Sequence, residues 1–136
     1  MIYLDSAAVV KLVRQEAHSA DLVTWLNAHD DVPLVCSALV EVEVPRAIRR
    51  SAPQALIGVP ATVGRLFRLE IDSTVRATAA AFAEPALRSL DAIHLATAQV
   101  LINESGAPLV AFVTYDRRLL ACAEDAGLPV ASPGQN

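Results

Sequence analysis

Short runs of apolar residues, each too brief for a helix, recur along the chain between longer segments with helical periodicity. The clearest run is Leu-Val-Ala-Phe-Val at residues 109–113; others cover residues 2–4 and 33–36, with an alternating run at 67–71 and an edge strand expected at 128–130. A strand that is apolar at successive positions is buried on both faces, as in a parallel sheet covered by helices. The pattern therefore predicts an α/β fold with a parallel central sheet.

The segments between these runs have the spacing of amphipathic helices. We expect Ser37, Asp72 and Ser89 to cap the helices that follow them. Pro45 falls inside one predicted helix, where it should cause a kink or a local break. The expected helices cover residues 6–14, 21–28, 38–50, 73–82, 90–102 and 117–125, with short helices over 52–66.

Composition restricts the class of protein further. Apolar residues make up 54% of the 136-residue chain and charged residues 19%, which favours one folded domain over residues 1–136. The net charge of −4 excludes a simple polycationic nucleic-acid binder, but not a nucleic-acid substrate whose site is built from carboxylates and a cation. No signal-type leader opens the chain, and Cys36 and Cys122 lack metal-type spacing. We expect a soluble cytoplasmic protein.

Four acidic residues lie in apolar surroundings. Asp5 directly follows the first strand and Asp116 follows residues 112–115, while Asp91 and Glu43 lie within predicted helices. Ligand sites of open parallel sheets form beyond the carboxyl ends of the strands. Each acid alone has an ordinary explanation: Asp5 and Asp116 as helix caps, Asp91 as a first-turn acid, Glu43 as a solvated helix residue. Together they can meet only at one end of one sheet.

Such a cluster favours a bound cation. Two carboxylates about 5 Å apart repel by roughly 3 kcal/mol at an effective dielectric near 20. Mg²⁺ prefers oxygen ligands, and no Cys/His set at zinc spacing competes. A cation of this kind suits phosphodiester hydrolysis, because it polarises the phosphoryl oxygen and lowers the pKa of a bound water.

Four sequence motifs identify a family. They are Ile-Tyr-Leu-Asp-Ser at residues 2–6, residues 37–43 followed by Arg46-Ala47, Leu-Asp-Ala-Ile-His-Leu-Ala at 90–96, and residues 113–119. In this order, and in a chain of this length, they resemble the PIN-domain ribonucleases of the VapC toxin type. The resemblance covers residues 1–130.

The resemblance implies a three-layer α/β/α PIN-like domain with a parallel central sheet. It also implies endoribonuclease activity that depends on Mg²⁺, with Mn²⁺ as a substitute. The partners implied are an RNA substrate, a small VapB-type antitoxin and a second copy of the chain in a homodimer. Apolar residues of the segments 17–28 and 53–66 are candidates for the dimer surface.

The family motifs assign the site residues. Asp5, Glu43, Asp91 and Asp116 carry over as the catalytic, metal-binding acids. Asp5 and Asp91 would be direct ligands, and the other two would act directly or through water. The hydroxyl residues Ser6 and Thr114 carry over as hydrogen-bonding supports.

Two positions near these acids admit more than one interpretation. Glu41 and Glu43 are two residues apart, so on a helix they cannot point the same way. Glu43 is favoured because Arg46-Ala47 follows it at the family spacing, although Pro45 keeps Glu41 open. His94 shares a helix face with Asp91; we expect a structural histidine bonded to a neighbour, although it could touch the site.

Basic residues are few and unevenly placed. Arg46, Arg49 and Arg50 share one helix face, and Arg117 and Arg118 directly follow Asp116. They are candidates for contacts with RNA phosphates around the acidic centre, although exposed arginines are also ordinary solvated residues.

Other phosphate chemistries fit the sequence less well. Haloacid-dehalogenase-like phosphatases need a second acid two residues after the first, where this chain has Ala7. Receiver domains need a late lysine, and Lys11 is the only lysine present. A DNA-directed or structure-specific nuclease outside a toxin–antitoxin system, or a non-catalytic binding module of the same fold, remains open.

Overall fold

Five parallel strands form the centre of the computed structural model, which describes residues 1–135. Their order across the sheet is β3-β2-β1-β4-β5, so the amino-terminal strand is central. Ile2 of β1 lies opposite Leu34 of β2 on one side and Ala111 of β4 on the other. The predicted parallel sheet is confirmed. The strands are β1 (Ile2–Leu4), β2 (Leu34–Ser37), β3 (Phe67–Leu69), β4 (Ala111–Val113) and β5 (Val130–Ala131).

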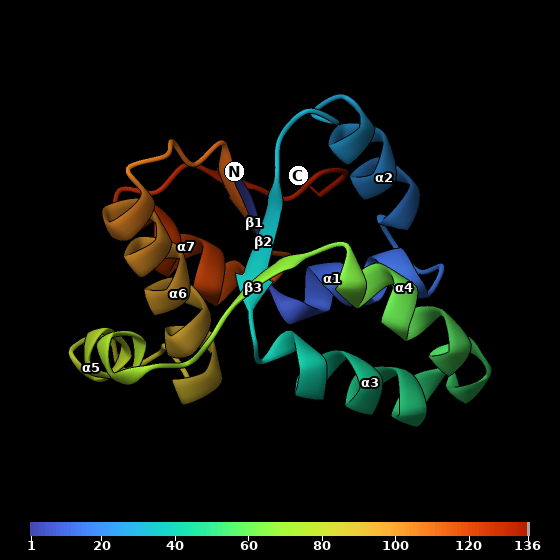
Figure 1. The fold of residues 1–136 in the computed structure, drawn as a ribbon, viewed down its shortest axis with the longest axis horizontal. Helices are drawn as coiled ribbons and strands as arrows, with labels where there is room; N and C mark the ends of the chain where they lie inside the picture. Colours follow the sequence, from blue (N-terminus) through green and yellow to red (C-terminus); the bar gives the residue numbers. More distant parts are fainter. Residues whose placement is uncertain (136) are drawn as a thin grey trace.

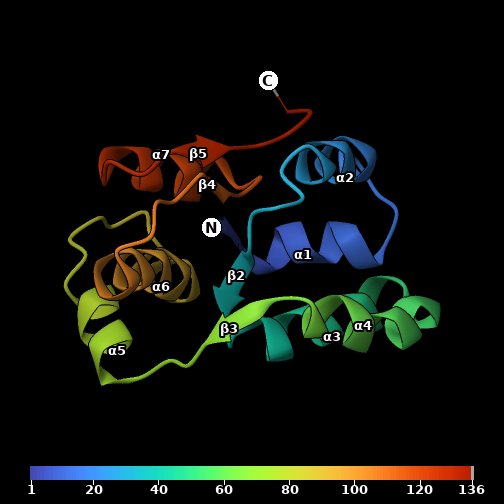
Figure 2. The same ribbon diagram turned by 45° about the horizontal axis from the view of Figure 1, so that its top comes forward.

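Helices cover both faces of this sheet. The first four α-helices gather on one side, and α6 and α7 lie on the other with α5 packed against α6 (Figures 1 and 2). This is the expected three-layer arrangement. The helices are α1 (Ser6–Val13), α2 (Ser19–Asn27), α3 (Val40–Ser51), α4 (Val59–Gly64), α5 (Ser73–Ala80), α6 (Ser89–Ser105) and α7 (Arg117–Asp125), with a 3₁₀ helix, η1, at Pro53–Gly58.

The alternation of side chains in β1 explains the two layers. Ile2 and Leu4 enter a core shared with α1, α3 and α4, whereas Tyr3 points to the other face and stacks on Phe112 at a ring-centroid distance of 4.9 Å. All of these side chains are fully buried. Burying a large apolar side chain stabilises the fold by about 1.5–3 kcal/mol, so the central strand is held from both sides.

The helix that follows β2 differs from the prediction. Ser37 is the last residue of β2, and the N-cap position of α3 belongs to Leu39. The hydroxyl of Ser37 accepts a hydrogen bond from the Leu39 N–H at 3.1 Å, so it stabilises the turn before the helix. Of the kink or local break expected at Pro45, the break is absent, because α3 continues through this residue to Ser51. Pro45 removes only one hydrogen bond close to the start of the helix.

The start of α6 also differs from the prediction. Ser89 is the first helical residue and not its cap; Arg88 holds the N-cap position, and no side chain caps this end. By contrast, Asp72 caps α5 as predicted, accepting a hydrogen bond from the Val75 N–H at 2.9 Å. Several strands are shorter than their apolar runs, as in β4, which begins at Ala111 and not at 109.

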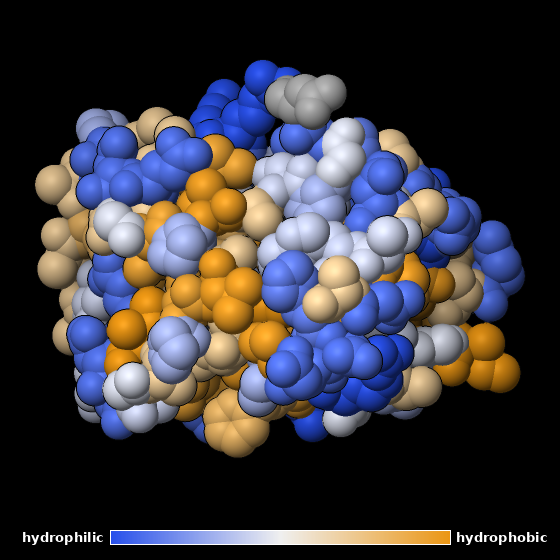
Figure 3. Space-filling model, turned by 90° about the horizontal axis from the view of Figure 1, so that it is seen from above, coloured by the Kyte–Doolittle hydropathy of each residue, from blue (hydrophilic) through white to orange (hydrophobic). Residues whose placement is uncertain are grey.

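The arrow of β2 points toward the lower edge of the molecule in Figure 1, which is therefore the carboxyl edge of the parallel sheet. Figure 3 shows the opposite face, where apolar side chains lie exposed on the left and polar side chains cover most of the right. Within residues 1–135, no helix combines the length and apolar character needed to span a membrane.

Candidate active site

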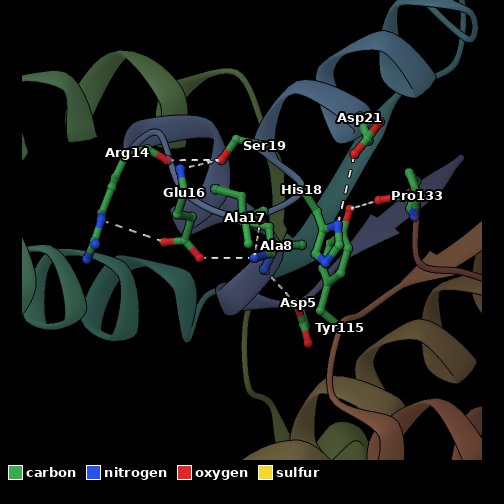
Figure 4. Close-up of polar contacts among 11 residues, drawn as sticks. Asp5, Ala8, Arg14, Glu16, Ala17, His18, Ser19, Asp21, Tyr115 and Pro133 are labelled. Carbon is green, nitrogen blue, oxygen red and sulfur yellow. Dashed lines mark hydrogen bonds and ion pairs between the residues drawn. The ribbon is translucent and has the colours of Figure 1, made fainter. Parts of the chain in front are cut away.

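Asp5 lies at the carboxyl end of β1 and caps helix α1. Its side chain is nearly fully buried, with 4% of the residue exposed. One carboxylate oxygen accepts a hydrogen bond from the Ala8 N–H at 2.8 Å (Figure 4), and the other accepts one from the Thr114 hydroxyl at 2.6 Å. The first turn of α1 and the residue after β4 thus fix this carboxylate in one orientation.

Asp116 follows β4 and caps helix α7. Its carboxylate accepts hydrogen bonds from the N–H groups of Arg118 at 2.8 Å and Leu119 at 3.2 Å. Its own N–H donates to the Thr114 hydroxyl at 3.1 Å. Thr114 therefore joins Asp5 and Asp116 through one hydroxyl group.

The residue between Thr114 and Asp116 anchors this loop. The Tyr115 hydroxyl donates to the Pro133 carbonyl at 2.8 Å, and its ring stacks on His18 with centroids 5.5 Å apart (Figure 4). The ammonium group of Lys11 lies 4.6 Å from the centre of the same ring. Segments from both ends of the chain thus hold the loop that carries Asp116.

Glu43 turns from α3 toward α1 and α6. One carboxylate oxygen accepts from the Ser6 hydroxyl at 2.7 Å and lies 2.8 Å from Nε2 of His94. Nδ1 of His94 lies 2.7 Å from the hydroxyl of the buried Tyr3. Because an ionised carboxylate only accepts hydrogen bonds, Nε2 donates to Glu43. In a neutral imidazole, Nδ1 is then the acceptor for the Tyr3 hydroxyl. His94 is thus a buried structural histidine that also touches the site.

The surroundings shift the pKa values of these carboxyl groups in different directions. Burial raises the pKa of Asp5, whereas His94 and the hydrogen bonds from Thr114 and Ala8 lower it in part; the charge of Asp91 adds to the rise. Burial and the charge of Asp116 raise the pKa of Asp91. Burial would also raise the pKa of Glu43, but its hydrogen bonds to His94 and Ser6 outweigh this effect and lower that pKa.

A cleft of about 370 Å³ lies where these elements meet. Within residues 1–135, no three His, Cys, Asp or Glu side chains lie close enough together to form a metal-ligand cluster. Three of the four predicted acids, Glu43, Asp91 and Asp116, line this cleft, and the buried Asp5 does not. Mutual repulsion between the carboxylates disfavours a closer approach. Hydrogen bonds to other groups also hold Glu43 and Asp116 in place. The lining residues are Glu43, Arg88, Ser89, Leu90, Asp91 and Asp116.

The donors available in this cleft suit a hard cation. They are the carboxylate oxygens of Glu43, Asp91 and Asp116. Burial is the main cause of the raised pKa of Asp91, and repulsion from Asp116 adds to it. A divalent cation would relieve that repulsion, and Mg²⁺ typically binds a few carboxylates while keeping several waters. The residues present therefore fit such an ion.

The other candidate residues of the sequence analysis lie outside the cleft. Glu41 is exposed and pairs with Arg68 at 3.8 Å, so Glu43 and not Glu41 reaches the cleft. The α3 arginines line a shallow pocket of their own, of about 260 Å³; they are Arg46, Arg49 and Arg50. Arg117 and Arg118 are exposed at the start of α7 and do not line the cleft.

Comparison with known proteins decides the family. The PIN-domain family model matches residues 2–125. The chain is also 53% identical over 135 residues to Ribonuclease VapC35 of Mycobacterium tuberculosis, covering 99% of this chain and 98% of that protein. The chain belongs to the PIN-domain family, in its VapC-type ribonuclease group. Ribonuclease VapC47 of the same species is 37% identical, with 98% of each chain covered.

Solved structures agree on the fold. Mycobacterium tuberculosis VapC20, described as a toxin that cleaves the sarcin–ricin loop, superposes with a TM-score of 0.68 at 15% identity, covering 98% of this chain and all of that one. VapBC2 from Rickettsia felis, bound to a promoter DNA fragment, gives a TM-score of 0.59 at 15% identity, covering 87% of this chain and 90% of that one. VapC-type ribonucleases generally use a divalent metal.

Two residues of this VapC-type chain were missed by the sequence reasoning. Tyr3 was assigned only to a strand, yet its hydroxyl completes the hydrogen bonding of His94. Arg88 was not singled out, yet it lines the cleft. A signal existed for Arg88: a cation directly before an expected helix is on the unfavourable side of the helix dipole.

Proposed function

We propose that this chain is the toxin of a toxin–antitoxin pair and that it hydrolyses phosphodiester bonds within RNA with the help of Mg²⁺. The observation that supports this most strongly is the arrangement of four acids from separate elements at the carboxyl edge of one parallel sheet. The charge of Asp91 raises the pKa of Asp5, and the charges of Asp116 and Glu43 raise the pKa of Asp91. A binding module without catalysis has no need to sustain this repulsion.

The carboxylates would hold the ion. Asp5 and Asp91 are the proposed direct ligands, with Glu43 and Asp116 acting directly or through water, and Mn²⁺ would substitute for Mg²⁺. A bound cation of this type supplies Lewis-acid activation of water and offsets the charge of the leaving oxygen.

The chain's own residues orient these groups. The Thr114 hydroxyl and the Ala8 N–H fix both oxygens of Asp5. The Ser6 hydroxyl and His94 hold Glu43 toward the cleft. These bonds keep the carboxylates in place before substrate arrives, which reduces the reorganisation needed during the reaction.

Arginines outside the cleft would contact the RNA backbone. Arg46 lies one helical turn beyond Glu43 on α3, and Arg49 and Arg50 extend the same face away from the acidic centre. Arg117 and Arg118 offer a second set of cations beside Asp116. Phosphate contacts of this kind position a nucleic acid without reading its sequence.

The proposed partners follow the family. A VapB-type antitoxin is proposed because one structural relative is the VapBC2 complex. A guanidinium group from such a partner would match the carboxylates of the cleft. We also propose a homodimer and a cytoplasmic location.

A cleavage assay tests the proposal. Purified chain is incubated with total RNA, and separately with an RNA and a DNA of the same sequence, in Mg²⁺, Mn²⁺ or EDTA. We expect RNA cleavage that EDTA abolishes and that Asp91→Asn removes. Asp72→Asn, a cap of α5 remote from the cleft, is the control and should cleave as wild type does. Cleavage of DNA alone, or cleavage that survives EDTA and Asp91→Asn, would refute the proposal.

A further inference from the structure

Arg88 is one of the residues that line the acidic cleft. Its Nε lies 4.0 Å from an oxygen of Asp91, and one terminal nitrogen lies 3.9 Å from an oxygen of Asp116. Among the described residues that line the cleft, Arg88 is the basic one. The side chain is 72% exposed, so the guanidinium reaches both solvent and the two carboxylates.

Stability does not account for this placement. Arg88 occupies the N-cap position of α6, where the positive end of the helix dipole disfavours a cation. Both ion pairs are long, and solvent-exposed pairs of this kind contribute little to folding. The side chain makes no closer polar contact within residues 1–135 that would fix it there.

The chemistry of the cleft offers another explanation. An RNA phosphate that enters it meets the negative side chains of Glu43, Asp91 and Asp116. A cationic group of the protein beside them would offset this repulsion and hold the phosphate. A guanidinium suits this task because its planar fork forms two parallel hydrogen bonds to a phosphate. Long ion pairs leave the N–H donors of Arg88 available for such bonds.

We propose that Arg88 contacts the phosphate group of the RNA strand that lies in the cleft, and so positions it against the carboxylates. This inference rests on the proposed function, since it assumes that RNA is the substrate. Arg88 thereby differs from the α3 arginines, which line a separate pocket and would hold phosphates further along the strand.

The test compares Arg88→Ala and Arg88→Lys with Arg65→Ala. Arg65 is exposed at the end of α4 and lines a different pocket, so it is a matched control. Binding of a fluorescein-labelled single-stranded RNA is measured by anisotropy in EDTA, which keeps the RNA intact, over a series of KCl concentrations. Cleavage of the same RNA in Mg²⁺ gives kcat and KM, and thermal unfolding shows whether each variant is folded.

We expect Arg88→Ala to lower RNA affinity and kcat/KM by about tenfold, and to reduce the salt-dependence slope by about 1. Arg88→Lys should recover part of the affinity, because it keeps the charge and loses the fork. Arg65→Ala should match wild type, and all three should unfold at the wild-type temperature.

Unchanged RNA affinity and slope in Arg88→Ala would overturn the inference, even if cleavage fell, since Arg88 would then act only on the carboxylates. A different result would refute the proposed function, namely that the wild type cleaves no RNA. In that case a loss of RNA affinity in Arg88→Ala would still support the phosphate contact.

Discussion

Replacing Tyr3 with Phe tests whether the buried chain of hydrogen bonds behind Glu43 exists. The Tyr3 hydroxyl lies 2.7 Å from Nδ1 of His94, and both residues are almost inaccessible to solvent. Phe keeps the ring and its stacking on Phe112, with planes only 3° apart. The substitution thus removes one hydroxyl and leaves Nδ1 of His94 without its donor.

The expected loss of stability is substantial. A buried acceptor that loses its partner costs about 1–3 kcal/mol. With an unfolding entropy of about 2.1 cal/mol/K per residue, the 136-residue chain has about 290 cal/mol/K, so 2 kcal/mol lowers Tm by about 7 °C.

Thermal unfolding followed by circular dichroism measures this shift. Tyr115→Phe is a matched control, because Tyr115 is the other tyrosine in the chain and its hydroxyl bonds the Pro133 carbonyl in a partly exposed position. There water can replace the lost partner, so we expect a loss of about 0.5–1 kcal/mol. Equal Tm values for Tyr3→Phe and wild type would refute the proposed arrangement of donors.

Three further sets of substitutions test the site and its surroundings. Glu43→Gln should abolish RNA cleavage while Glu41→Gln, at an exposed position paired with Arg68, should largely spare it in the same gel assay; equal losses would contradict the placement of Glu43. Asp72→Ala and Asp116→Ala each remove a helix cap and should lower the free energy of unfolding by about 1 kcal/mol in urea titrations, but only Asp116→Ala should lose cleavage. Reversing charge at Arg49 and Arg50 should weaken RNA binding and flatten its salt dependence, and an unchanged slope would remove them from the RNA path.

The sequence predicts the sheet and most helices because their signals are local. Apolar runs identify the buried strands, and the Asp72 cap follows from one residue type at one position. The starts of α3 and α6 differ from the prediction because a serine near a helix start favours a cap that the fold does not use. In the fold, Ser37 is still part of β2, and Arg88 holds the cap position before Ser89.

The candidate site is predicted only in part. The acids stand out because carboxylates are rare in apolar segments, and strand order brings them to one edge. Their supports are harder to foresee, because the bond from Tyr3 to His94 joins residues 91 positions apart. The spread of the carboxylates also depends on competing hydrogen bonds, such as that from Ser6 to Glu43, which residue spacing does not reveal.

The central position of β1 has a consequence for the cell that makes this protein. The first strand to be synthesised needs β4, residues 111–113, as its neighbour, and Asp5 receives its hydroxyl donor from a residue 109 positions later. A nascent chain therefore cannot assemble the acidic centre until most of it has left the ribosome. The proposed ribonuclease activity can therefore appear only after four of the five strands of the sheet have been made.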